Sequence, residues 1–250
     1  MGSLLCSVVI PAYNAERTIA FALESAMAQT VADLEIIVSD DGSKDSTRDV
    51  VHAFMEKDER IRLVETPENT GVAGARNRGV QAARSDFIAF LDSDDGWKPE
   101  KLEKQLSLAV KTGAGIVYTG AACIDAEGKP VEREFRVPET VTLRDILSGN
   151  DIICSSALVR KELLLRHPMG NSHLHEDYIT WIGILGDGES AAGIAEPLVI
   201  YRIDIRSKSG NKLRSAKMQW ETYKEVKIPF FSRLGYMMRY AAHGIKRYVL

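Results

Sequence analysis

The chain has 250 residues, of which 45% are hydrophobic; this is enough to bury a core and excludes a disordered protein. Its formal net charge of −3 at pH 7 excludes strong attraction of the whole molecule to nucleic acid. The three cysteines, Cys6, Cys123 and Cys154, fit neither a disulfide framework nor a zinc pattern, and they favour a reducing cytoplasm. The opening segment is too short for a membrane span and lacks the features of a signal peptide.

Four apolar runs in the first half of the chain alternate with segments of helical periodicity. The runs are residues 7–10, 35–38, 61–64 and 87–91. Ile19, Leu23 and Met27 recur every four residues after Asn14, the expected helix cap, and a second helix is expected after Asp45 and Ser46. Strands that are continuously hydrophobic and alternate with helices indicate a mixed, mainly parallel sheet with helices on both faces. The predicted class is therefore α/β, with ligands at the carboxyl ends of the strands.

The second half of the chain is less regular. A helix is expected over residues 98–113, a strand over 115–119, and a hairpin over 121–137 that turns at "DAEGKP". Residues 150–205 are expected to combine short strands with a helix around "HEDYITWIGIL".

Each of the four predicted strands is followed by a polar segment. These segments read "PAYNAE", "SDDGSKDST", "ETPENTGVAGARNRG" and "DSDDGW". Because the ends of parallel strands meet along one edge of a sheet, the segments are expected to line a single crevice.

Three aspartates, Asp92, Asp94 and Asp95, lie within four positions directly after the fourth apolar run. Carboxylates this close repel each other by about 4 kcal/mol at an effective dielectric of about 20, so the cluster predicts a positive partner. Mg²⁺ and Mn²⁺ commonly take one or two protein carboxylates and complete their shell with water and phosphate, which suits a nucleotide diphosphate. The alternative is an exposed turn that caps the following helix, a role expected of Asp95, with Trp97 packed beneath it.

Two further polar segments suggest ligand contacts. Asp40 and Asp41 end the second strand, where carboxylates can accept hydrogen bonds from a base N–H or from ribose hydroxyls, while Gly42 permits a tight turn. Arg76 and Arg78 follow the third strand at an expected helix start, and guanidinium groups there suit a phosphate or an acidic cluster.

Five motifs, in this order and at this spacing, resemble the family 2 glycosyltransferases of the GT-A fold. They are "SVVIPAYNAE", "IIVSDDGSKDST", "ENTGVAGARNRG", "FIAFLDSDDGW" and "LHEDYITW", and the resemblance covers about residues 5–205. It implies inverting transfer of a sugar from a nucleotide-diphosphate donor to an acceptor hydroxyl. By family frequency the donor is expected to be a UDP-sugar. The expected acceptor is a lipid-linked glycan in cell-surface polysaccharide biosynthesis.

The same resemblance implies a role for individual residues. Pro11, Tyr13 and Glu16 border the nucleotide, Asp41 with Asp40 binds the base, Arg76 lies near the diphosphate, Asp92 and Asp94 form the D-x-D pair, and Glu176 precedes the general base Asp177. Asp94 is the expected ligand of Mn²⁺ or Mg²⁺. The chemistry agrees, because an inverting displacement needs a Lewis acid on the departing diphosphate and a base on the opposite face of the sugar.

Four more residues are candidates for donor or acceptor contacts, each with a simpler alternative. Trp181 is either a wall on which a sugar stacks or a core tryptophan. His175, like His173, either lines the acceptor cleft or is a polar loop residue. Arg202 and Arg206 either contact the diphosphate or are solvated surface charges.

The resemblance divides the chain into a nucleotide-sugar-binding half, residues 1–120, an acceptor half with the catalytic base, residues 121–208, and a basic amphipathic helical tail, residues 209–250. From Asn211 to Leu250 there are nine Lys or Arg and two Glu, so this segment carries +7 and the remainder −10. The expected apolar stripe consists of Phe231, Leu234, Met238, Ala241, Ile245 and Val249, with Arg233, Arg239, Lys246 and Arg247 on the other side.

A basic amphipathic helix is typical of an anionic membrane surface. The sequence therefore predicts a cytoplasmic protein with peripheral contact through residues 228–250 to the inner face of the plasma membrane. Packing of this helix on its own domain, or in a homodimer, is the alternative.

Two other function classes remain open at this point. A sugar nucleotidyltransferase also combines an α/β sheet with acidic metal sites, although the sequence lacks an early basic loop for a triphosphate and such a reaction gives "HEDY" no role. A non-catalytic nucleotide-sugar-binding protein is the second alternative, and the presence of both carboxylate motifs disfavours it.

Overall fold

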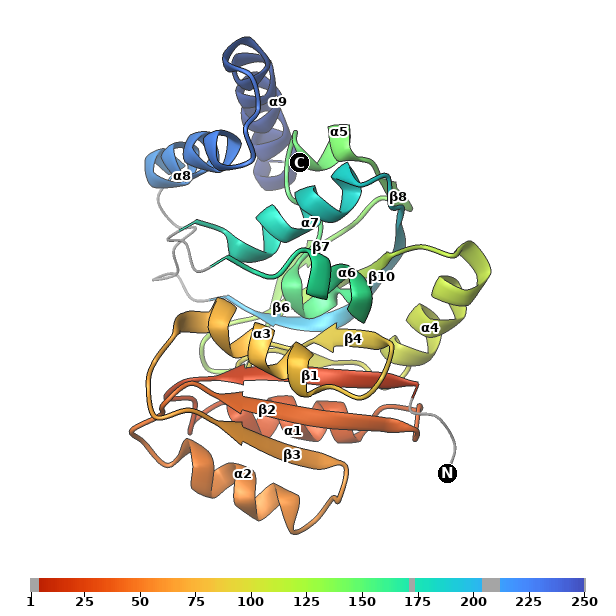
Figure 1. The fold of residues 1–250 in the computed structure, drawn as a ribbon, viewed down its shortest axis with the longest axis vertical. Coiled ribbons are helices and arrows are strands. Elements are labelled where there is room, and N and C mark those ends of the chain that lie inside the picture. Colours follow the sequence, from red (N-terminus) through yellow and green to blue (C-terminus); the bar gives the residue numbers. More distant parts are fainter. Residues whose placement is uncertain (1–4, 171–173, 204–211, 250) are drawn as a thin grey trace.

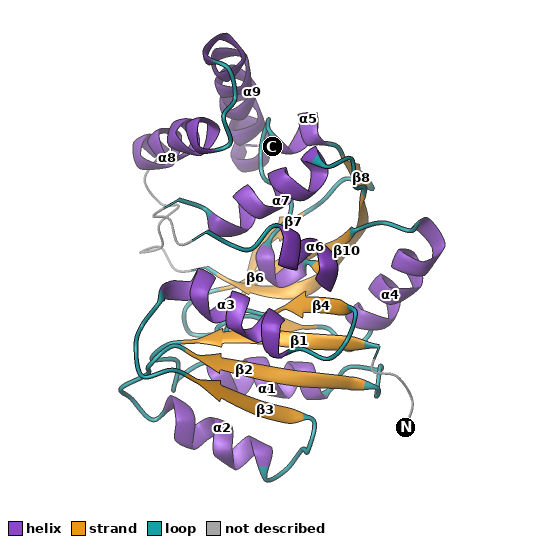
Figure 2. Ribbon diagram, viewed as in Figure 1, coloured by secondary structure: helices purple, strands orange, loops and turns teal. Residues whose placement is uncertain are grey.

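The computed structural model describes residues 5–170, 174–203 and 212–249, with the backbone alone for 212–214 and 242–249. Figures 1 and 2 show one central sheet with helices on both faces. Its strands are β1 (Cys6–Ala12), β2 (Leu34–Asp40), β3 (Ile61–Glu65), β4 (Phe87–Phe90), β5 (Gly96–Trp97), β6 (Ile116–Ile124), β7 (Pro130–Phe135), β8 (Thr140–Val141), β9 (Leu158–Arg160) and β10 (Ala191–Arg202). The helices are α1 (Ile19–Met27), α2 (Thr47–Met55), α3 (Gly71–Ala82), α4 (Lys101–Thr112), α5 (Leu143–Ile146), the 3₁₀ turn η1 (Cys154–Ser156), α6 (Lys161–Arg166), α7 (Glu176–Gly186), α8 (Lys212–Glu225) and α9 (Phe230–Val249).

The sheet is mixed and mainly parallel. Within the described residues its order is β3-β2-β1-β4-β9-β6-β10-β5, with β7 beside β6 and β8 beside β10. β1 pairs in parallel with β2 and β4, and β2 with β3, so the polar segments after the first four apolar runs lie at one edge, as predicted. β9 runs antiparallel between β4 and β6 and joins the two halves into one sheet.

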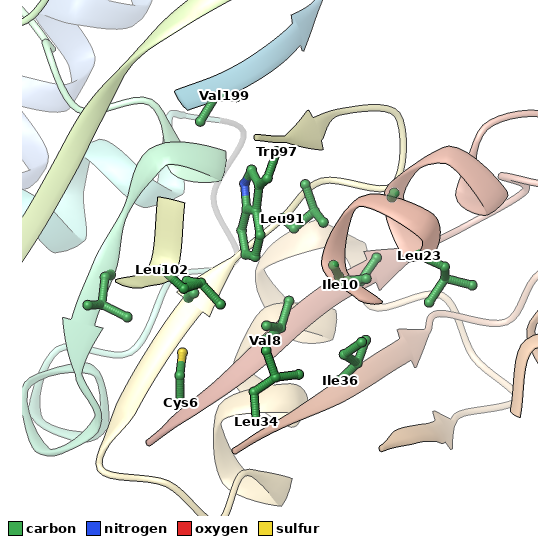
Figure 3. Packing of buried hydrophobic residues seen from close by; sticks show 14 of the residues in the cluster. Cys6, Val8, Ile10, Leu23, Leu34, Ile36, Leu91, Trp97, Leu102 and Val199 are labelled. Carbon is green, nitrogen blue, oxygen red and sulfur yellow. The ribbon is translucent and has the colours of Figure 1, made fainter. Parts of the chain in front are cut away.

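Alternate residues of β1 enter two different cores. Val8 and Ile10 pack with α1, α2 and α4 on one face, and Figure 3 shows both beside Leu23, Trp97 and Leu102. Val9 faces the other way, toward a core that holds buried residues of α3, α5, α6, α7 and α8. Both faces of the sheet are therefore buried, which explains why its strands are continuous apolar runs.

The predicted strands and helices are present, but two of the expected helix caps are wrong. Asn14 adopts a left-handed φ of 50° and its N–H donates to Ser43 Oγ, while α1 begins later, at Ile19, after Thr18. Ser46 precedes α2 but makes no side-chain cap. The expected hairpin is confirmed, with its turn closed by hydrogen bonds between Asp125 and Lys129.

The C-terminal segment forms two helices. α8 ends before Lys227, whose left-handed φ of 58° and the following Pro229 redirect the chain into α9. Within the described residues, no helix is both long and apolar enough to cross a membrane.

Candidate active site

Helix α3 lies unusually close to the sheet. A Cβ at Gly79 would come within 2.4 Å of Val9 Cγ1, so only glycine allows this approach. The three residues directly before Gly79, which are Arg76, Asn77 and Arg78, thus contact three different parts of the site.

Asp41 anchors the amino-terminal end of α3. Its carboxylate accepts four hydrogen bonds, from the backbone N–H groups of Thr70 and Gly71, from Thr70 Oγ1 and from Arg78 Nη2. Burial would raise the pKa of Asp41, but these donors outweigh it and hold the pKa below its ordinary value. A carboxylate at a helix N-terminus is also favoured by the helix dipole.

Asp40 is fully buried beside Asp41. Its Oδ2 accepts from Ser43 N–H and from Arg48, and its Oδ1 has no partner among the described residues. Gly42, which follows Asp41, adopts a φ of 80°, as the tight turn requires. These contacts give both aspartates a structural role, and their contact with the base stays a prediction.

Arg76 joins the two acidic motifs of the site. Nη2 lies 2.6 Å from Asp92 Oδ1, and Nη1 lies 2.8 Å from Glu176 Oε1. The guanidinium is buried, with only 4% of the side chain exposed. Arg76 was expected beside the diphosphate, but in the structure both terminal nitrogens are occupied by carboxylates. Its observed role is to hold the exit of β4 against the start of α7.

Asn77 makes a second connection, between α3 and the segment that precedes α7. Its side-chain amide donates to Met169 O at 2.8 Å and its oxygen accepts from Met169 N–H at 3.0 Å. This pair of hydrogen bonds fixes the chain shortly before Glu176. The observed contacts of the "ARNRG" side chains are therefore mostly ones that position other parts of the protein.

The exit of β4 is organised by Ser155, which no sequence motif marks. Ser155 Oγ accepts from Asp92 N–H at 3.1 Å and donates to Asp95 Oδ2 at 2.6 Å, while its carbonyl accepts from Trp97 Nε1. Asp95 is buried and also accepts from Arg202 N–H, so it is no helix cap. Burial, with the charges of Asp94 and Asp92, raises the pKa of Asp95 well above its usual range.

Asp94 is the exposed aspartate of this cluster. Its carboxylate makes no ion pair or side-chain hydrogen bond with the described residues, while its neighbours are both tied to donors. Desolvation by the surrounding protein and the charge of Asp92 raise the pKa of Asp94 to about 6. A carboxylate that is accessible, unpaired and repelled by like charge is suited to a divalent cation.

The described residues contain no cluster of three or more metal-ligating side chains. A cation at Asp94 would therefore need oxygen ligands from water and from a diphosphate, which is how Mg²⁺ and Mn²⁺ are often held. The residues present fit a metal of that kind.

Arg202 fixes the loop that carries Asp94. It ends β10, and its guanidinium donates to the carbonyl oxygens of Asp94, Asp125 and Ala126. Its contact with the diphosphate stays a prediction.

Asp177 occupies the first turn of α7, next to the Arg76 pair. Burial and the charge of Glu176 raise the pKa of Asp177 to about 6, against the opposing charges of Arg76 and His175. A base with a pKa slightly below neutrality is ionised at physiological pH and can still take up a proton effectively.

The exit of β1 contributes a half-exposed aromatic ring. Pro11 is buried in β1, and Tyr13 is 49% exposed. Glu16 accepts from Ser46 N–H at 2.9 Å and so ties this loop to the exit of β2. Nucleotide contacts of all three residues stay predictions.

The remaining candidates have different outcomes. Trp181 is fully buried, with its ring 6.4 Å from that of Phe90, so a stacking wall for sugar is wrong and the core alternative is right. His175 precedes α7 without capping it, and its role stays a prediction. Arg206 and His173 lie outside the described residues.

Comparison with known proteins identifies the family. Residues 7–166 match the model described as Glycosyl transferase family 2. The chain is 35% identical over 244 residues to the putative teichuronic acid biosynthesis glycosyltransferase TuaG of Bacillus subtilis, covering 97% of each chain. It is also 35% identical to the Escherichia coli UDP-Glc:alpha-D-GlcNAc-diphosphoundecaprenol beta-1,3-glucosyltransferase WfgD, covering 99% of this chain and 96% of that one.

Solved structures support the fold. S. aureus TarS 1–349 in complex with UDP-GlcNAc superposes with a TM-score of 0.71 at 18% identity, over 95% of this chain and 70% of that one. The mannosyltransferase PcManGT from Pyrobaculum calidifontis, in complex with GDP-Man and Mn²⁺, gives 0.70 at 20% identity, over 88% and 63%. Family membership decides against a nucleotidyltransferase and a non-catalytic binder: the chain is a GT-A-fold enzyme of glycosyltransferase family 2.

Proposed function

We propose that the enzyme transfers a sugar, with inversion, from a UDP-sugar to a hydroxyl of a lipid-linked glycan in bacterial cell-surface polysaccharide biosynthesis. The names of TuaG and WfgD support this acceptor class, and WfgD and the TarS complex support a UDP-linked donor. Full-length similarity to the first two relatives supports a shared reaction type.

The observation that carries the proposal is the bridge made by Arg76. It brings the Asp92–Asp94 motif and the Glu176–Asp177 motif to one place, although the two lie on different elements. A direct displacement requires a leaving-group site and a base site on either side of one sugar carbon, and two motifs held close together by a shared arginine support such an arrangement.

Asp177 is assigned as the general base. Its pKa of about 6 leaves it ionised at neutral pH, ready to accept the proton of the attacking hydroxyl. Glu176, paired with Arg76, orients the start of α7 and adds the negative charge that raises the pKa of its neighbour. Because the base activates an acceptor hydroxyl, attack from the face opposite the diphosphate inverts the sugar.

Asp94 is assigned to a divalent cation, Mn²⁺ or Mg²⁺, which when bound would neutralise the charge of the departing diphosphate. Arg202 holds the backbone of Asp94 in place, and Ser155 does the same for Asp92. The chain's own residues thus fix the loop before any ligand binds.

A donor screen with the purified enzyme tests the function. It would be incubated with nucleotide sugars, Mn²⁺ or Mg²⁺ and a diphosphate-linked acceptor analogue, and the released nucleotide and the anomeric configuration of the product would be measured. Release of UDP with inversion is expected. Retention of configuration would overturn the inverting mechanism. Preference for a donor with a base other than uracil would overturn the assignment of a UDP-sugar.

The Asp177→Asn variant tests the base. Transfer is expected to fall by about 10³-fold, because a general base contributes roughly 10²–10⁴-fold, while the thermal unfolding curve stays cooperative. Turnover within a few-fold of the unaltered enzyme would remove Asp177 from this role.

A further inference from the structure

Helix α9 exposes a set of large apolar side chains. On its described part these are Phe230, Phe231, Leu234 and Met238, and Phe231 and Met238 are 85% and 71% exposed. They fall on one side of the helix, at the spacing expected for a single face. This set is called the apolar face below. Figure 1 shows α9 at the end of the molecule opposite α2.

The apolar face is not the side by which α9 packs on the protein. Tyr236 and Met237 make that contact, against the core beneath α7, and the rings of Tyr236 and Tyr223 lie 6.0 Å apart. Arg233 reinforces the attachment, since it donates to Ile228 O and lies over the ring of Trp220. The helix is therefore docked by one face. Of the apolar face, Phe230 also meets the ring of Trp220 in α8, while Phe231, Leu234 and Met238 are exposed.

A basic pocket adjoins the apolar face. It has a volume of about 320 Å³ and is lined by Arg144 of α5 and by Ser232, Gly235, Tyr236 and Arg239 of α9. Neither arginine has an ion pair with another described residue. Asp145 is close to Arg144, but its carboxylate is bound by Thr142 in a capping box. Two arginines and a hydroxyl converging on a pocket suit a phosphate group.

Charge distinguishes between the two kinds of partner that an apolar face can have. From Val226 to Leu250 the sequence has no Asp or Glu, and five Lys or Arg. A second copy of the helix would bring like charges together and would leave the basic pocket unfilled. An anionic bilayer supplies both hydrocarbon for the apolar side chains and phosphates for the arginines.

We propose that the apolar face of α9 lies in the interface of an anionic lipid bilayer and that Arg144 and Arg239 receive a lipid headgroup phosphate. The lipid contact stands on these surface features alone. Its use, to place the active site beside an acceptor carried by a lipid, rests on the proposed function.

Vesicle flotation of the full chain, without donor or acceptor, tests the contact. Binding is expected to be at least about tenfold stronger to phosphatidylcholine vesicles containing phosphatidylglycerol than to phosphatidylcholine alone. Phe231→Ser with Met238→Ser should lower binding at least about tenfold, and Arg144→Gln with Arg239→Gln by roughly tenfold or more. Inorganic phosphate as a competitor should lower binding to the vesicles by no more than the Arg144→Gln, Arg239→Gln change does, because the apolar contact is retained.

Matched controls are available on α4. Val110 is 82% exposed and Lys111 is also exposed. The separate variants Val110→Ser and Lys111→Gln therefore remove one exposed apolar side chain and one exposed basic side chain away from α9, and both should leave flotation unchanged. Transfer to a water-soluble acceptor should survive in all four variants, which separates failure of the lipid contact from failure of the proposed function.

Sedimentation without vesicles tests the other partner. If the Phe231→Ser, Met238→Ser protein loses a dimer that the unaltered chain forms, while its flotation is unchanged, the apolar face is a subunit interface and the proposal is overturned. Equal binding to neutral and anionic vesicles would overturn the headgroup site.

Discussion

Two acidic clusters lie at the same edge of the sheet, and they differ in the positive partners of their carboxylates. After β2, Asp40 and Asp41 are buried and each is paired with its own arginine, Arg48 or Arg78. After β4, Arg76 binds Asp92 and also Glu176, whereas Arg202 donates to the Asp94 carbonyl and, through its backbone N–H, to Asp95, so neither arginine pairs with the Asp94 carboxylate. The pKa of Asp41 is accordingly lowered, and that of Asp94 is raised to about 6.

The difference shows that the two clusters are held differently: the carboxylates after β2 have positive partners within the protein, and Asp94 after β4 has none among the described residues. Where the chain supplies its own cations, the carboxylates hold loops and the start of α3 in place. Where it leaves a carboxylate exposed and repelled by its neighbours, we propose that a ligand brings the positive charge. The similar segments "SDDG" and "DSDDG" thus differ in the pKa and accessibility of their carboxylates, because their arginine partners differ.

The largest expected effect tests this distinction at Asp94. Asp94→Asn should lower transfer by about 10³-fold, because a bound cation contributes several kcal/mol to stabilisation of the departing diphosphate. Initial rates measured across a Mn²⁺ titration would show it. Asp49→Asn, on the exposed side of α2, is the matched control and should retain full activity. A metal response unchanged in the Asp94 variant would contradict the assignment.

Removal of the shared arginine should affect both stability and catalysis. Arg76→Met leaves Asp92 and Glu176 without their buried partner, which typically costs about 3–5 kcal/mol of unfolding free energy. It should also raise the pKa of Asp177, since Arg76 now lowers it, so the acidic limb of the pH–rate profile moves to higher pH.

Arg78→Met is the control for Arg76. It removes the partner of Asp41 and should lower stability in urea without moving the acidic limb. Identical pH profiles for the two variants would show that Arg76 does not act on the base.

At the β2 exit the expected effect is on folding. Asp41→Asn weakens four hydrogen bonds at the start of α3 and should cost about 2 kcal/mol, or about 4–8 °C in Tm for a chain of this size. The KM for the donor, measured on the folded protein, tests the predicted base contact separately. An unchanged Tm would contradict the anchoring role.

The smallest expected effect is that of Asp94→Asn on stability. It is a gain, whereas Asp41→Asn causes a loss. A carboxylate whose pKa is raised on folding destabilises the protein as pH rises from the unfolded pKa, near 3.8, through about 6. Asp94→Asn should therefore raise Tm at pH 7 by about 1–3 °C after allowance for solvent screening, and the gain should vanish at pH 4. A lower Tm at pH 7 would place Asp94 with the scaffold aspartates.

Much of the fold could be predicted because its signals are local. Apolar runs at regular intervals gave β1 to β4, and their parallel pairing follows from the intervening helices. Asn14 was misassigned as a cap because its left-handed turn depends on a hydrogen bond that its N–H donates to Ser43 Oγ, in the loop after β2. The described part of the stripe on α9, with Phe231, Leu234 and Met238, was also predictable from periodicity, whereas Ile245 and Val249 lie outside the described side chains. The turn at Lys227 carries no glycine to mark it.

The candidate site was predictable as a set of residues but not as a set of pairs. Which aspartate has its own cation depends on contacts such as that between Arg76 and Glu176, 100 residues apart. Ser155 lies in an apolar stretch with no motif, and its role follows only from its place beneath Asp92 and Asp95. Trp181 follows Asp177 by four residues and so lies on the same side of a helix, but this spacing does not say that the ring turns into the core, where it is fully buried.

The bridge at Arg76 has a consequence for how such enzymes can diverge. Asp92 and Glu176 share one guanidinium, so a substitution at either changes the charge felt by the other. Their effects should be non-additive in a double-mutant cycle, although the two side chains need not touch. Exchange of donor or acceptor halves between relatives would succeed only when the arginine and both of its carboxylates come from compatible parents.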